Sequence, residues 1–417
     1  MRIPLFMLLC FCLNLPAANW PAWRGATGDG VCTEKNLPTK WGAKENVKWR
    51  VALPERGNST PIIWGKRIFI TQPVGNDRML FCMDREQGRE LWRAGAKGAE
   101  KEPTHGTNPF ASGSPTTDGE RVFAFFGSAG LFCFDMEGAE LWSRRDLGLQ
   151  HHIWGSGPSP VLHGDLCLLN FGPGDKTALI AFDKKTGKTV WQNEEATGYQ
   201  HPQGGEKGNQ GRTYIGSWAT PILYKEDSKD ALLMSWPGRL CSVDPISGKE
   251  FWSAKGLNPL VYTSPLQGDG IAVGMGGFGG KALAVRMGGK GDVTDSHRAW
   301  FHNVSPQRIG SGVVHQGHLY IHNDPGTAMC LNLKTGATVW NERLPGSGTN
   351  WSSVMLAEGL CYTLTQAGNC YVFKAGTKFE LVSTNTLGEP SNSSVAASDG
   401  ELFIRTHRAL WCINARR

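Results

Sequence analysis

The chain has 417 residues and a formal net charge of +6, and it contains 54 glycines, 23 prolines and 16 tryptophans. Its length exceeds the usual size of one hydrophobic core, so it must be either multidomain or a repeat array. The basic residues are scattered without a Lys/Arg run, which argues against nucleic acid as a partner.

Residues 1–18 have the features of a secretory signal peptide. Arg2 precedes an apolar stretch over residues 5–15, and small alanines follow at positions 17 and 18. The apolar stretch is too short to cross a bilayer, and no later segment reaches that length. We therefore predict an exported protein, periplasmic or extracellular, with a cleaved signal peptide and no membrane span.

A short pattern recurs along almost the whole of the remaining chain. Its clearest copy is AFDKKTGKTVW at Ala181–Trp191, and the others lie at Met83–Trp92, Phe134–Trp142, Ser242–Trp252 and Leu331–Trp340. Every copy holds a glycine four residues before the tryptophan. Repeats of about 40–50 residues built from strands and tight turns are typical of propellers and solenoids. We interpret the repeated tryptophans as wedges that dock one blade against the next.

Eight predicted opening strands begin at a Ser/Thr-Pro pair or its equivalent. These starts are Thr60-Pro61, Ser114-Pro115, Ser159-Pro160, Thr220-Pro221, Ser264-Pro265, Gly312-Val313, Ser353-Val354 and Ser394-Val395. The eighth repeat stops at residues 410–414 without a fourth strand, whereas residues 47–54 form an unassigned strand that carries Trp49. Pairing that strand with the last repeat leaves no edge exposed.

The predicted fold is therefore an all-β, eight-bladed β-propeller of four-stranded antiparallel blades, closed by an N-terminal strand that completes the last blade. The propeller spans residues 47–417, and residues 19–46 form an N-terminal extended segment. Two repeats depart from the pattern. The fifth carries an insertion before Trp300, and the seventh places Phe379 near the tryptophan position.

Nine cysteines follow the predicted signal peptide. Cys82, Cys133, Cys330 and Cys412 each stand two residues before the Asp or Asn of the motif, at equivalent places in different repeats. Equivalent points in different blades lie too far apart for a disulfide, so these cysteines are predicted to be buried as small apolar residues. Whether Cys361 and Cys370, which flank a predicted hairpin, form a pair is left open.

The repeat Ala-x-Asp-x-x-Thr-Gly-Lys-x-x-Trp resembles that of the PQQ-like, quinoprotein-type β-propeller family, over roughly residues 45–414. The start at Trp20–Gly25 resembles exported, uncharacterised bacterial members related to the outer-membrane assembly propeller lipoprotein. The resemblance implies either a cofactor-free scaffold or a dehydrogenase that binds pyrroloquinoline quinone and calcium. The chain has neither the adjacent cysteines nor the Cys-x-x-Cys-His segment that such dehydrogenases carry, which favours the scaffold.

Loops between blades, and loops between second and third strands, should emerge on one face of the ring. They are irregular and rich in polar and aromatic residues, as binding loops on a rigid scaffold are. The candidate ligand-binding residues at this channel mouth are His151, His152, Trp154, Trp218, Tyr262, Arg308, Asn323, Asp324, Trp351, Arg405 and His407.

Two groups among these candidates suggest ligand chemistry. His151 and His152 could bind a metal or an anion, but adjacent residues rarely chelate one ion, so we predict no metal site. Trp218, Tyr262 and Trp351 could form a stacking floor for a flat cofactor or a sugar, or could simply pack the mouth of the channel.

No nucleophile elbow or zinc-protease motif occurs, and few carboxylates fall in the mouth loops, so no catalytic residue is assigned. The sequence favours an exported, non-catalytic, monomeric scaffold without a cofactor, which binds a protein, peptide or glycan partner at the channel mouth. The alternative is a pyrroloquinoline quinone-dependent dehydrogenase of alcohols or sugars, with PQQ and calcium at the same mouth.

Overall fold

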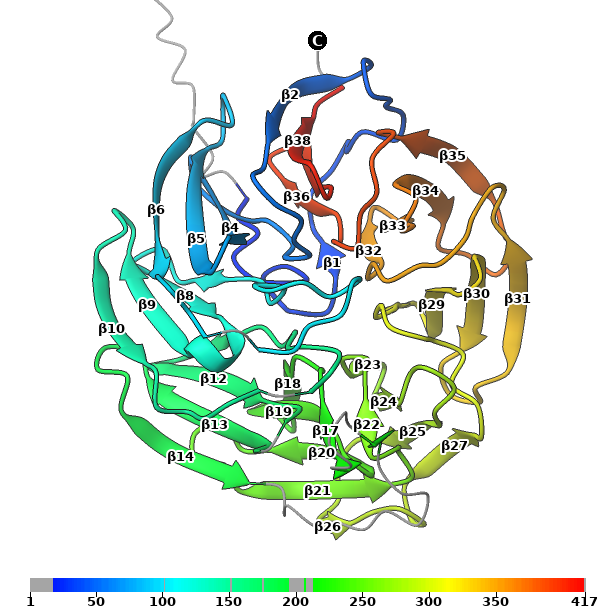
Figure 1. The fold of residues 1–417 in the computed structure, drawn as a ribbon. Coiled ribbons are helices and arrows are strands. Elements are labelled where there is room, and N and C mark those ends of the chain that lie inside the picture. Colours follow the sequence, from blue (N-terminus) through cyan, green and yellow to red (C-terminus); the bar gives the residue numbers. More distant parts are fainter. Residues whose placement is uncertain are drawn as a thin grey trace, which may run out of the picture.

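The computed structural model describes residues 18–100, 102–150, 152–174, 176–194, 206–207 and 213–415. Within them, eight four-stranded antiparallel units are arranged radially around a central axis (Figure 1). The predicted eight-bladed β-propeller is confirmed. No helix in these ranges is long and apolar enough to span a membrane. The predicted signal peptide, apart from Ala18, lies outside the described residues.

The first four blades follow one another along the chain. Blade 1 comprises β3 (Ile62–Trp64), β4 (Arg67–Val74), β5 (Asp77–Asp84) and β6 (Glu90–Ala96). Blade 2 comprises β7 (Thr116–Thr117), β8 (Arg121–Phe125), β9 (Leu131–Asp135) and β10 (Glu140–Arg144), with the short 3₁₀ turn η1 (Gly127–Ala129). Blade 3 comprises β11 (Val161–His163), β12 (Leu166–Phe171), β13 (Ala178–Asp183) and β14 (Thr189–Glu194). Blade 4 comprises β18 (Ile222–Glu226), β19 (Lys229–Trp236), β20 (Arg239–Val243) and β21 (Glu250–Lys255).

The second half of the ring repeats this order. Blade 5 comprises β23 (Leu266–Gly268), β24 (Ile271–Met275), β25 (Ala282–Arg286) and β27 (Arg298–His302). Blade 6 comprises β28 (Val313–His315), β29 (His318–Asn323), β30 (Thr327–Asn332) and β31 (Thr338–Arg343). Blade 7 comprises β32 (Met355–Ala357), β33 (Leu360–Leu364), β34 (Asn369–Lys374) and β35 (Leu381–Thr386). Blade 8 comprises β36 (Ala396–Ser398), β37 (Glu401–Arg405), β38 (Ala409–Ile413) and β2 (Val47–Ala52).

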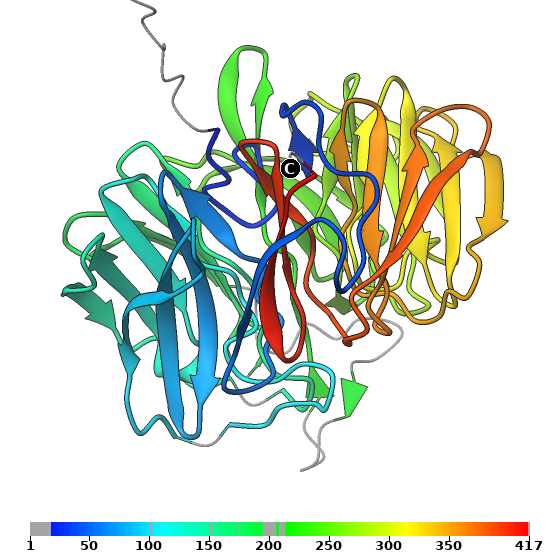
Figure 2. The same ribbon diagram turned by 90° about the horizontal axis from the view of Figure 1, so that it is seen from above.

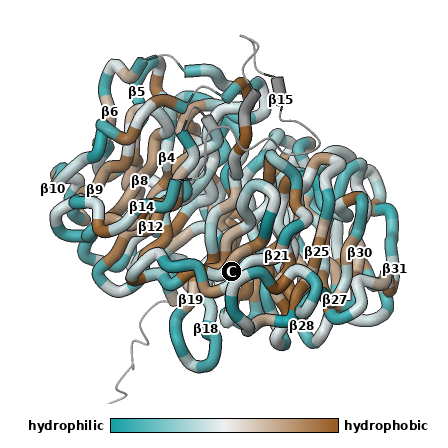
Figure 3. Tube along the Cα trace, turned by 90° about the horizontal axis from the view of Figure 1, so that it is seen from below, coloured by the Kyte–Doolittle hydropathy of each residue, from teal (hydrophilic) through white to brown (hydrophobic). Residues whose placement is uncertain are grey.

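Six short strands lie outside this scheme. They are β1 (Val31–Cys32) beside β32, β26 (Gly291–Asp292) beside β21, and the pairs β15 (Glu206–Lys207) with β16 (Thr213–Tyr214) and β17 (Gly216–Ser217) with β22 (Leu260–Val261). The β15–β16 pair and the β18–β19 hairpin lie on opposite faces of the ring (Figures 2 and 3). The β18–β19 side carries the turns between first and second strands, and we name it the turn face. The other side is the loop face.

The ring closes as predicted, since β2 pairs antiparallel with β38 and places Trp49 opposite Cys412. Each inner strand is buried on both sides, and alternate residues pack against opposite neighbours. Phe123 of β8 packs toward blade 3, whereas Val122 packs toward blade 1. The apolar residues accordingly concentrate inside the blades and the polar residues at the turns (Figure 3).

The motif tryptophans dock each blade onto the next hairpin turn. Trp142, for example, donates its indole N–H to the carbonyl of Lys184 at 2.9 Å, and its ring covers Gly187. Equivalent bonds join Trp49 to Arg85, Trp92 to Met136, Trp191 to Pro245, Trp300 to Leu333, and Trp340 to Gly376. The wedges explain the glycine four residues before each tryptophan, because only a glycine leaves room for the neighbouring indole.

We expect Gly187→Ala to lower the free energy of unfolding by about 3 kcal/mol, since a Cβ there would lie 2.6 Å from the Trp142 ring in a left-handed backbone with φ of 70°. Gly164→Ala is the matched control. It has φ of 52° but nothing within 4 Å, and should cost only about 1 kcal/mol. Urea denaturation of both variants measures the difference, and equal losses would contradict the wedge model.

Two blades replace the wedge. In blade 4, Trp252 donates instead to Glu226 of its own blade at 2.8 Å, and β26 from the predicted insertion adds a fifth strand beside β21. In blade 7, Ser383 stands opposite Val372, which is the register of the tryptophan in other blades. Phe379 lies outside strand β35 and packs on Trp340 instead, with 5.2 Å between ring centroids. The sequence predicted Phe379 near the tryptophan position of this blade, but Ser383 occupies that position.

The N-terminal segment crosses the turn face of the ring (Figure 1, dark blue). Trp20 forms a two-way backbone bridge with Ile63 of blade 1, and the carbonyl of Pro21 accepts the Thr117 N–H of blade 2. Farther along, β1 pairs in parallel with β32 of blade 7. The segment thus ties distant blades together across the end of the channel.

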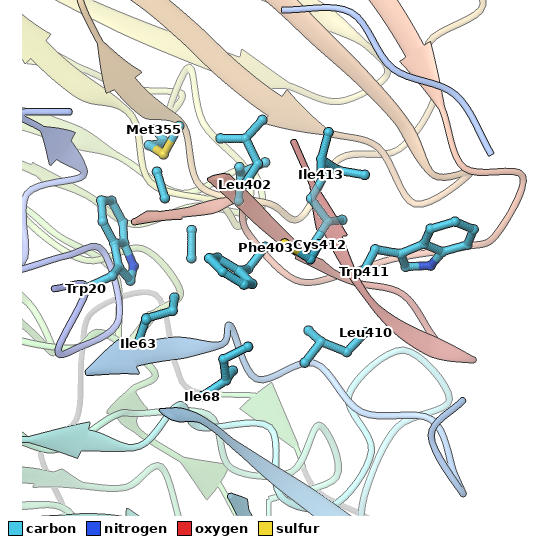
Figure 4. Close-up of a cluster of buried hydrophobic side chains, with 14 of the residues drawn as sticks. Trp20, Ile63, Ile68, Met355, Leu402, Phe403, Leu410, Trp411, Cys412 and Ile413 are labelled. Atoms are coloured by element: carbon cyan, nitrogen blue, oxygen red, sulfur yellow. The ribbon is translucent and has the colours of Figure 1, made fainter. Parts of the chain in front are cut away.

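The segment also supplies buried aromatic residues. Trp20 is buried among Ile63 and Met355, in the cluster that joins blades 7, 8 and 1 (Figure 4). Trp41 is 4% exposed in the same cluster, and its backbone N–H donates to Asn385 of β35 at 2.9 Å. This segment therefore contributes to the core rather than trailing from it.

All nine cysteines in the described part of the chain are buried and free. Cys361 and Cys370 therefore do not form a disulfide, and burial raises the pKa of both thiols well above its usual value. Cys82, Cys133, Cys330 and Cys412 each stand opposite a wedge tryptophan, as small apolar residues of the third strand.

Candidate functional site

A cavity of about 440 Å³ occupies the centre of the ring. Eight hydroxyl residues line it, one at the start of each blade, and each hydroxyl accepts the backbone N–H of its counterpart in the preceding blade at 2.8–3.2 Å. The donor–acceptor pairs are Thr60–Ser114, Ser114–Ser159, Ser159–Thr220, Thr220–Ser264, Ser264–Ser311, Ser311–Ser353, Ser353–Ser394 and Ser394–Thr60. We name this closed circle the hydroxyl ring.

The hydroxyl ring has two effects. It satisfies a buried backbone N–H at each strand start, which would otherwise be costly to leave unbonded. It also uses only the acceptor side of each hydroxyl, so every O–H remains available as a donor. Seven of these eight residues are the Ser/Thr positions predicted as strand starts, and the eighth, Ser311, directly precedes the start predicted at Gly312.

Four aromatic side chains line the cavity beside blades 3 to 5, and we name them the aromatic wall. Trp218 stacks on Tyr262 with centroids 4.7 Å apart and planes 10° from parallel. Phe278 follows, 5.7 Å from Tyr262 and 6.3 Å from Trp154. Loops between blades position Trp154, Trp218 and Tyr262, and the loop between β24 and β25 positions Phe278.

Phe278 is unusual both in its exposure and in its backbone conformation. Its side chain is 45% exposed, although it is large and apolar. Its φ of 41° is unfavourable for any residue other than glycine, and a backbone hydrogen bond to the carbonyl of Arg308 at 3.0 Å holds it there. The Arg308 guanidinium lies 4.2 Å from the centroid of the Phe278 ring.

Three asparagines line the cavity beside blades 8, 1 and 2, and we name them the amide wall. Asn58 and Asn392 both donate through Nδ2 to the carbonyl of Thr107, at 2.8 and 2.9 Å. Asn108 donates to the carbonyl of Trp154 at 2.6 Å. Since blades four positions apart face each other in a ring of eight, Asn58 and Asn392, beside blades 1 and 8, lie across the cavity from blades 5 and 4, whereas Asn108 lies next to Trp154, where the two walls meet.

The N-terminal segment, which crosses the turn face, contributes to the cavity. Its Trp23 is one of the lining residues. The adjacent Arg24 is 3% exposed and donates to the carbonyls of Ser311 and Gly312, at 2.9 and 2.6 Å. Burial lowers the pKa of Arg24 to about 10, so it remains charged at neutral pH. The N-terminal segment therefore lies across the turn-face end of the channel, on the side opposite the loop face.

The structure divides the predicted site residues into three groups. Trp154, Trp218, Tyr262 and Trp351 line the pocket. Arg308 and Asp324 stand just behind it as an ion pair, with 2.5 Å between Nη1 and Oδ2, and the Asp324 carboxylate also accepts the N–H of Asn350. Asn323 ends β29 in the same region.

The remaining candidates are structural or outside the described residues. His151 lies outside them. His152 is buried, meets the Trp218 ring edge-on at 4.7 Å, and accepts the Trp154 N–H, so it positions that loop. His407 and Arg405 do not line the pocket. Arg405 is 0% exposed and binds blade 1.

Three histidines, two of them buried and one half-buried, should make stability pH-dependent. Burial lowers the pKa of His152 to about 4, of His322 to about 3 and of His407 to about 4. Below pH 6.5 the unfolded chain therefore binds protons that the folded chain excludes, and stability falls until about pH 3. For His152 alone the loss amounts to about 3 kcal/mol.

Urea denaturation at intervals between pH 7 and pH 4 measures this loss. His322→Gln removes one titrating group, so its stability should depend less steeply on pH than that of the wild type. An unchanged slope in the His322 variant would contradict the assignment.

None of the described residues that line the pocket carries a carboxylate, imidazole, ammonium or guanidinium group. Pyrroloquinoline quinone is a tricarboxylate, and calcium is held by carboxylate and carbonyl oxygens. Burying such charges without partners is strongly unfavourable. The lining therefore does not fit the quinone and its calcium ion.

The sequence of the chain matches a known protein family. The model of the family described as outer membrane protein assembly factor BamB matches residues 31–142, 76–342 and 289–416. The chain belongs to the BamB family of PQQ-like propellers. No curated protein matches it.

Solved structures similar to this BamB-family chain include a BamB protein, a dehydrogenase and a designed protein. BamB from Moraxella catarrhalis is 12% identical with a TM-score of 0.61, covering 89% of this chain and 98% of its own. Quinohemoprotein alcohol dehydrogenase from Comamonas testosteroni is 11% identical with a TM-score of 0.70, covering 96% and 81%. The computationally designed protein Ika8 is 10% identical with a TM-score of 0.58, covering 87% and 98%. At such identities these similarities show the fold alone.

Sequence reasoning missed Trp23, Phe278 and the amide wall. The loops that carry Phe278, Asn108 and Asn392 were recognised as mouth loops, but no local pattern marks which of their residues face inward. The one available signal for Phe278 was a bulky residue inside the glycine run MGGFGG (residues 275–280), where the backbone is otherwise unrestricted.

Proposed function

We propose that this BamB-family chain is an exported, non-catalytic scaffold, periplasmic or extracellular and monomeric, which binds a protein, peptide or glycan partner through its loop face. One observation carries the proposal. The pocket at the channel mouth is large, open and lined with aromatic and amide side chains. Its described lining offers stacking surfaces and hydrogen bonds but no acid, base or metal ligand for a reaction. The BamB relationship supports a protein among the partners.

Capture from the exported fraction tests the proposal. The purified protein, immobilised through its C-terminus, should retain a specific partner, and Phe278→Ala should reduce that capture because its side chain stands exposed at the mouth. Ile246→Ala is the matched control, since Ile246 is 66% exposed on a hairpin turn of the turn face. Capture that survives Phe278→Ala unchanged would contradict binding at the mouth.

The dehydrogenase alternative is tested separately. Purified protein is mixed with pyrroloquinoline quinone and calcium, and dye reduction is followed with alcohols and sugars while tryptophan fluorescence reports binding. We expect neither fluorescence quenching at micromolar quinone nor turnover, because the described residues that line the pocket include no cation for the three carboxylates. Turnover that requires the quinone would overturn the non-catalytic assignment.

A further inference from the structure

We propose that the central pocket binds an uncharged saccharide, one sugar unit of which enters between the aromatic wall and the amide wall. This inference rests on the proposed function, because it names the ligand chemistry of the same site. The pocket has two chemically different sides. A pyranose ring has the matching asymmetry, with an apolar C–H face and a rim of hydroxyl groups.

The aromatic wall provides the surface for the C–H face. Trp218 and Tyr262 are stacked on each other, so they form one rigid block rather than two mobile rings. Trp218 is fixed further by donating its indole N–H to the carbonyl of Gly155 at 2.8 Å. Phe278 extends this surface outward at the mouth and is 45% exposed. Rigid, partly exposed aromatic rings bind flat apolar surfaces with little loss of entropy.

The amide wall contains acceptors that have no partner. Thr107 fixes the orientation of Asn58 and Asn392, because its carbonyl oxygen accepts Nδ2 of both. Their Oδ1 atoms are buried and have no hydrogen-bond partner among the described residues. Asn392 itself is only 9% exposed. An unsatisfied buried acceptor is unfavourable and points to a ligand that donates.

Donors without partners line the same pocket. The Trp351 indole N–H is buried and has no hydrogen-bond partner among the described residues. The hydroxyl ring adds O–H groups whose acceptor side is already used. A ligand that fits must therefore both donate and accept at several points. Hydroxyl groups do this, whereas a carboxylate or a phosphate only accepts and an ammonium only donates.

The absence of charge among the described lining residues selects a neutral ligand, since a buried charge without a partner is unfavourable. The volume of about 440 Å³ lies in the usual range for small-molecule sites. A peptide is less well matched. Extended peptides are usually recognised by main-chain pairing along a strand edge, whereas side-chain amides and hydroxyls surround this pocket.

Calorimetry with the full protein tests the inference. The probes are the neutral trisaccharides maltotriose, cellotriose, chitotriose and mannotriose, with trigalacturonic acid and the blocked tripeptide N-acetyl-trialanine amide as comparisons. At least one neutral trisaccharide should bind saturably and change tryptophan fluorescence. Trp218→Ala, Phe278→Ala and Asn392→Ala should each weaken binding about tenfold. The exposed controls Ile246→Ala and Asn341→Ala should not change it.

Phe278→Ala keeps the test valid if the other variants are unstable, because that side chain is exposed and its loss should not affect folding. The inference is overturned if none of the neutral trisaccharides binds at about 10 mM, a concentration that detects even millimolar affinity. It is also overturned if binding survives all three substitutions, or if the tripeptide or the acidic sugar binds instead. Partner capture without saccharide binding would leave the proposed function standing and remove only this inference.

Discussion

Arg405→Ala is expected to lower the free energy of unfolding by about 3–5 kcal/mol. The Arg405 guanidinium is fully buried where blade 8 meets blade 1. It donates to Ser59 Oγ and the Thr71 carbonyl, both at 2.7 Å, and to Gln72 Oε1 at 2.6 Å. Its removal leaves Gln72 Oε1 without its donor, takes one of two donors from both Ser59 Oγ and the Thr71 carbonyl, and opens a cavity across the closure of the ring.

Burial lowers the pKa of Arg405 to about 9, yet the group stays protonated at neutral pH. Arg405→Lys should restore little of the stability, because a point charge cannot reproduce the planar fork that reaches three acceptors. Urea denaturation followed by tryptophan fluorescence measures the loss. Arg408→Ala is the matched control, three residues away and exposed, and should change stability by less than about 0.5 kcal/mol. Similar losses in both variants would refute this role.

Trp49→Ala is expected to cost about 3 kcal/mol, at the lower end of the range for large-to-small changes of aromatic residues, because the indole is only partly buried. Its indole packs on Phe403 with centroids 6.2 Å apart and covers Gly88, and its N–H donates to the Arg85 carbonyl at 2.9 Å. Trp49 therefore joins β2 to blade 1, so its loss loosens the seam that closes the ring.

Trp49→Phe separates packing from hydrogen bonding. It keeps much of the buried ring but loses the N–H donor, and should cost about 1–2 kcal/mol. Limited proteolysis gives a second readout, since a loosened seam should expose the N-terminal strand to cleavage before the other blades. A wild-type cleavage pattern together with unchanged unfolding would show that β2 is not needed for closure.

The blades could be predicted because their evidence is local and repeated. One turn motif occurs in successive units, and each copy predicts the same hairpin, the same glycine and the same wedge. Closure by Trp49 followed from counting, since one strand was missing at one end and one was unassigned at the other. The mouth loops followed from the alternation of strand direction.

The interior of the site could not be predicted in the same way. Arg405 was a candidate ligand-binding residue because it is a charged residue in a predicted mouth loop. Its hydrogen-bond acceptors lie more than 300 positions away in blade 1, and no local pattern reveals them. The hydroxyl ring could not be predicted for the same reason. The backbone N–H of each serine or threonine donates to a hydroxyl of the next blade, about 40–60 residues further along the chain or, at the closure, at its other end. Trp23, Arg24 and Trp41 lie in a segment without the repeat, so no period marks them.

The joining of the two ends of the chain in one sheet has a consequence for biosynthesis. Blade 8 combines β2 with β36–β38, and the salt bridge between Lys48 and Glu401 connects residues 353 positions apart. Such a high contact order slows folding. Strand β2 is synthesised early and must wait, with its edge unpaired, until β38 has emerged, and chaperones would be most needed during that interval. A chain shortened by even its final twenty residues should accumulate as an open, aggregation-prone arc.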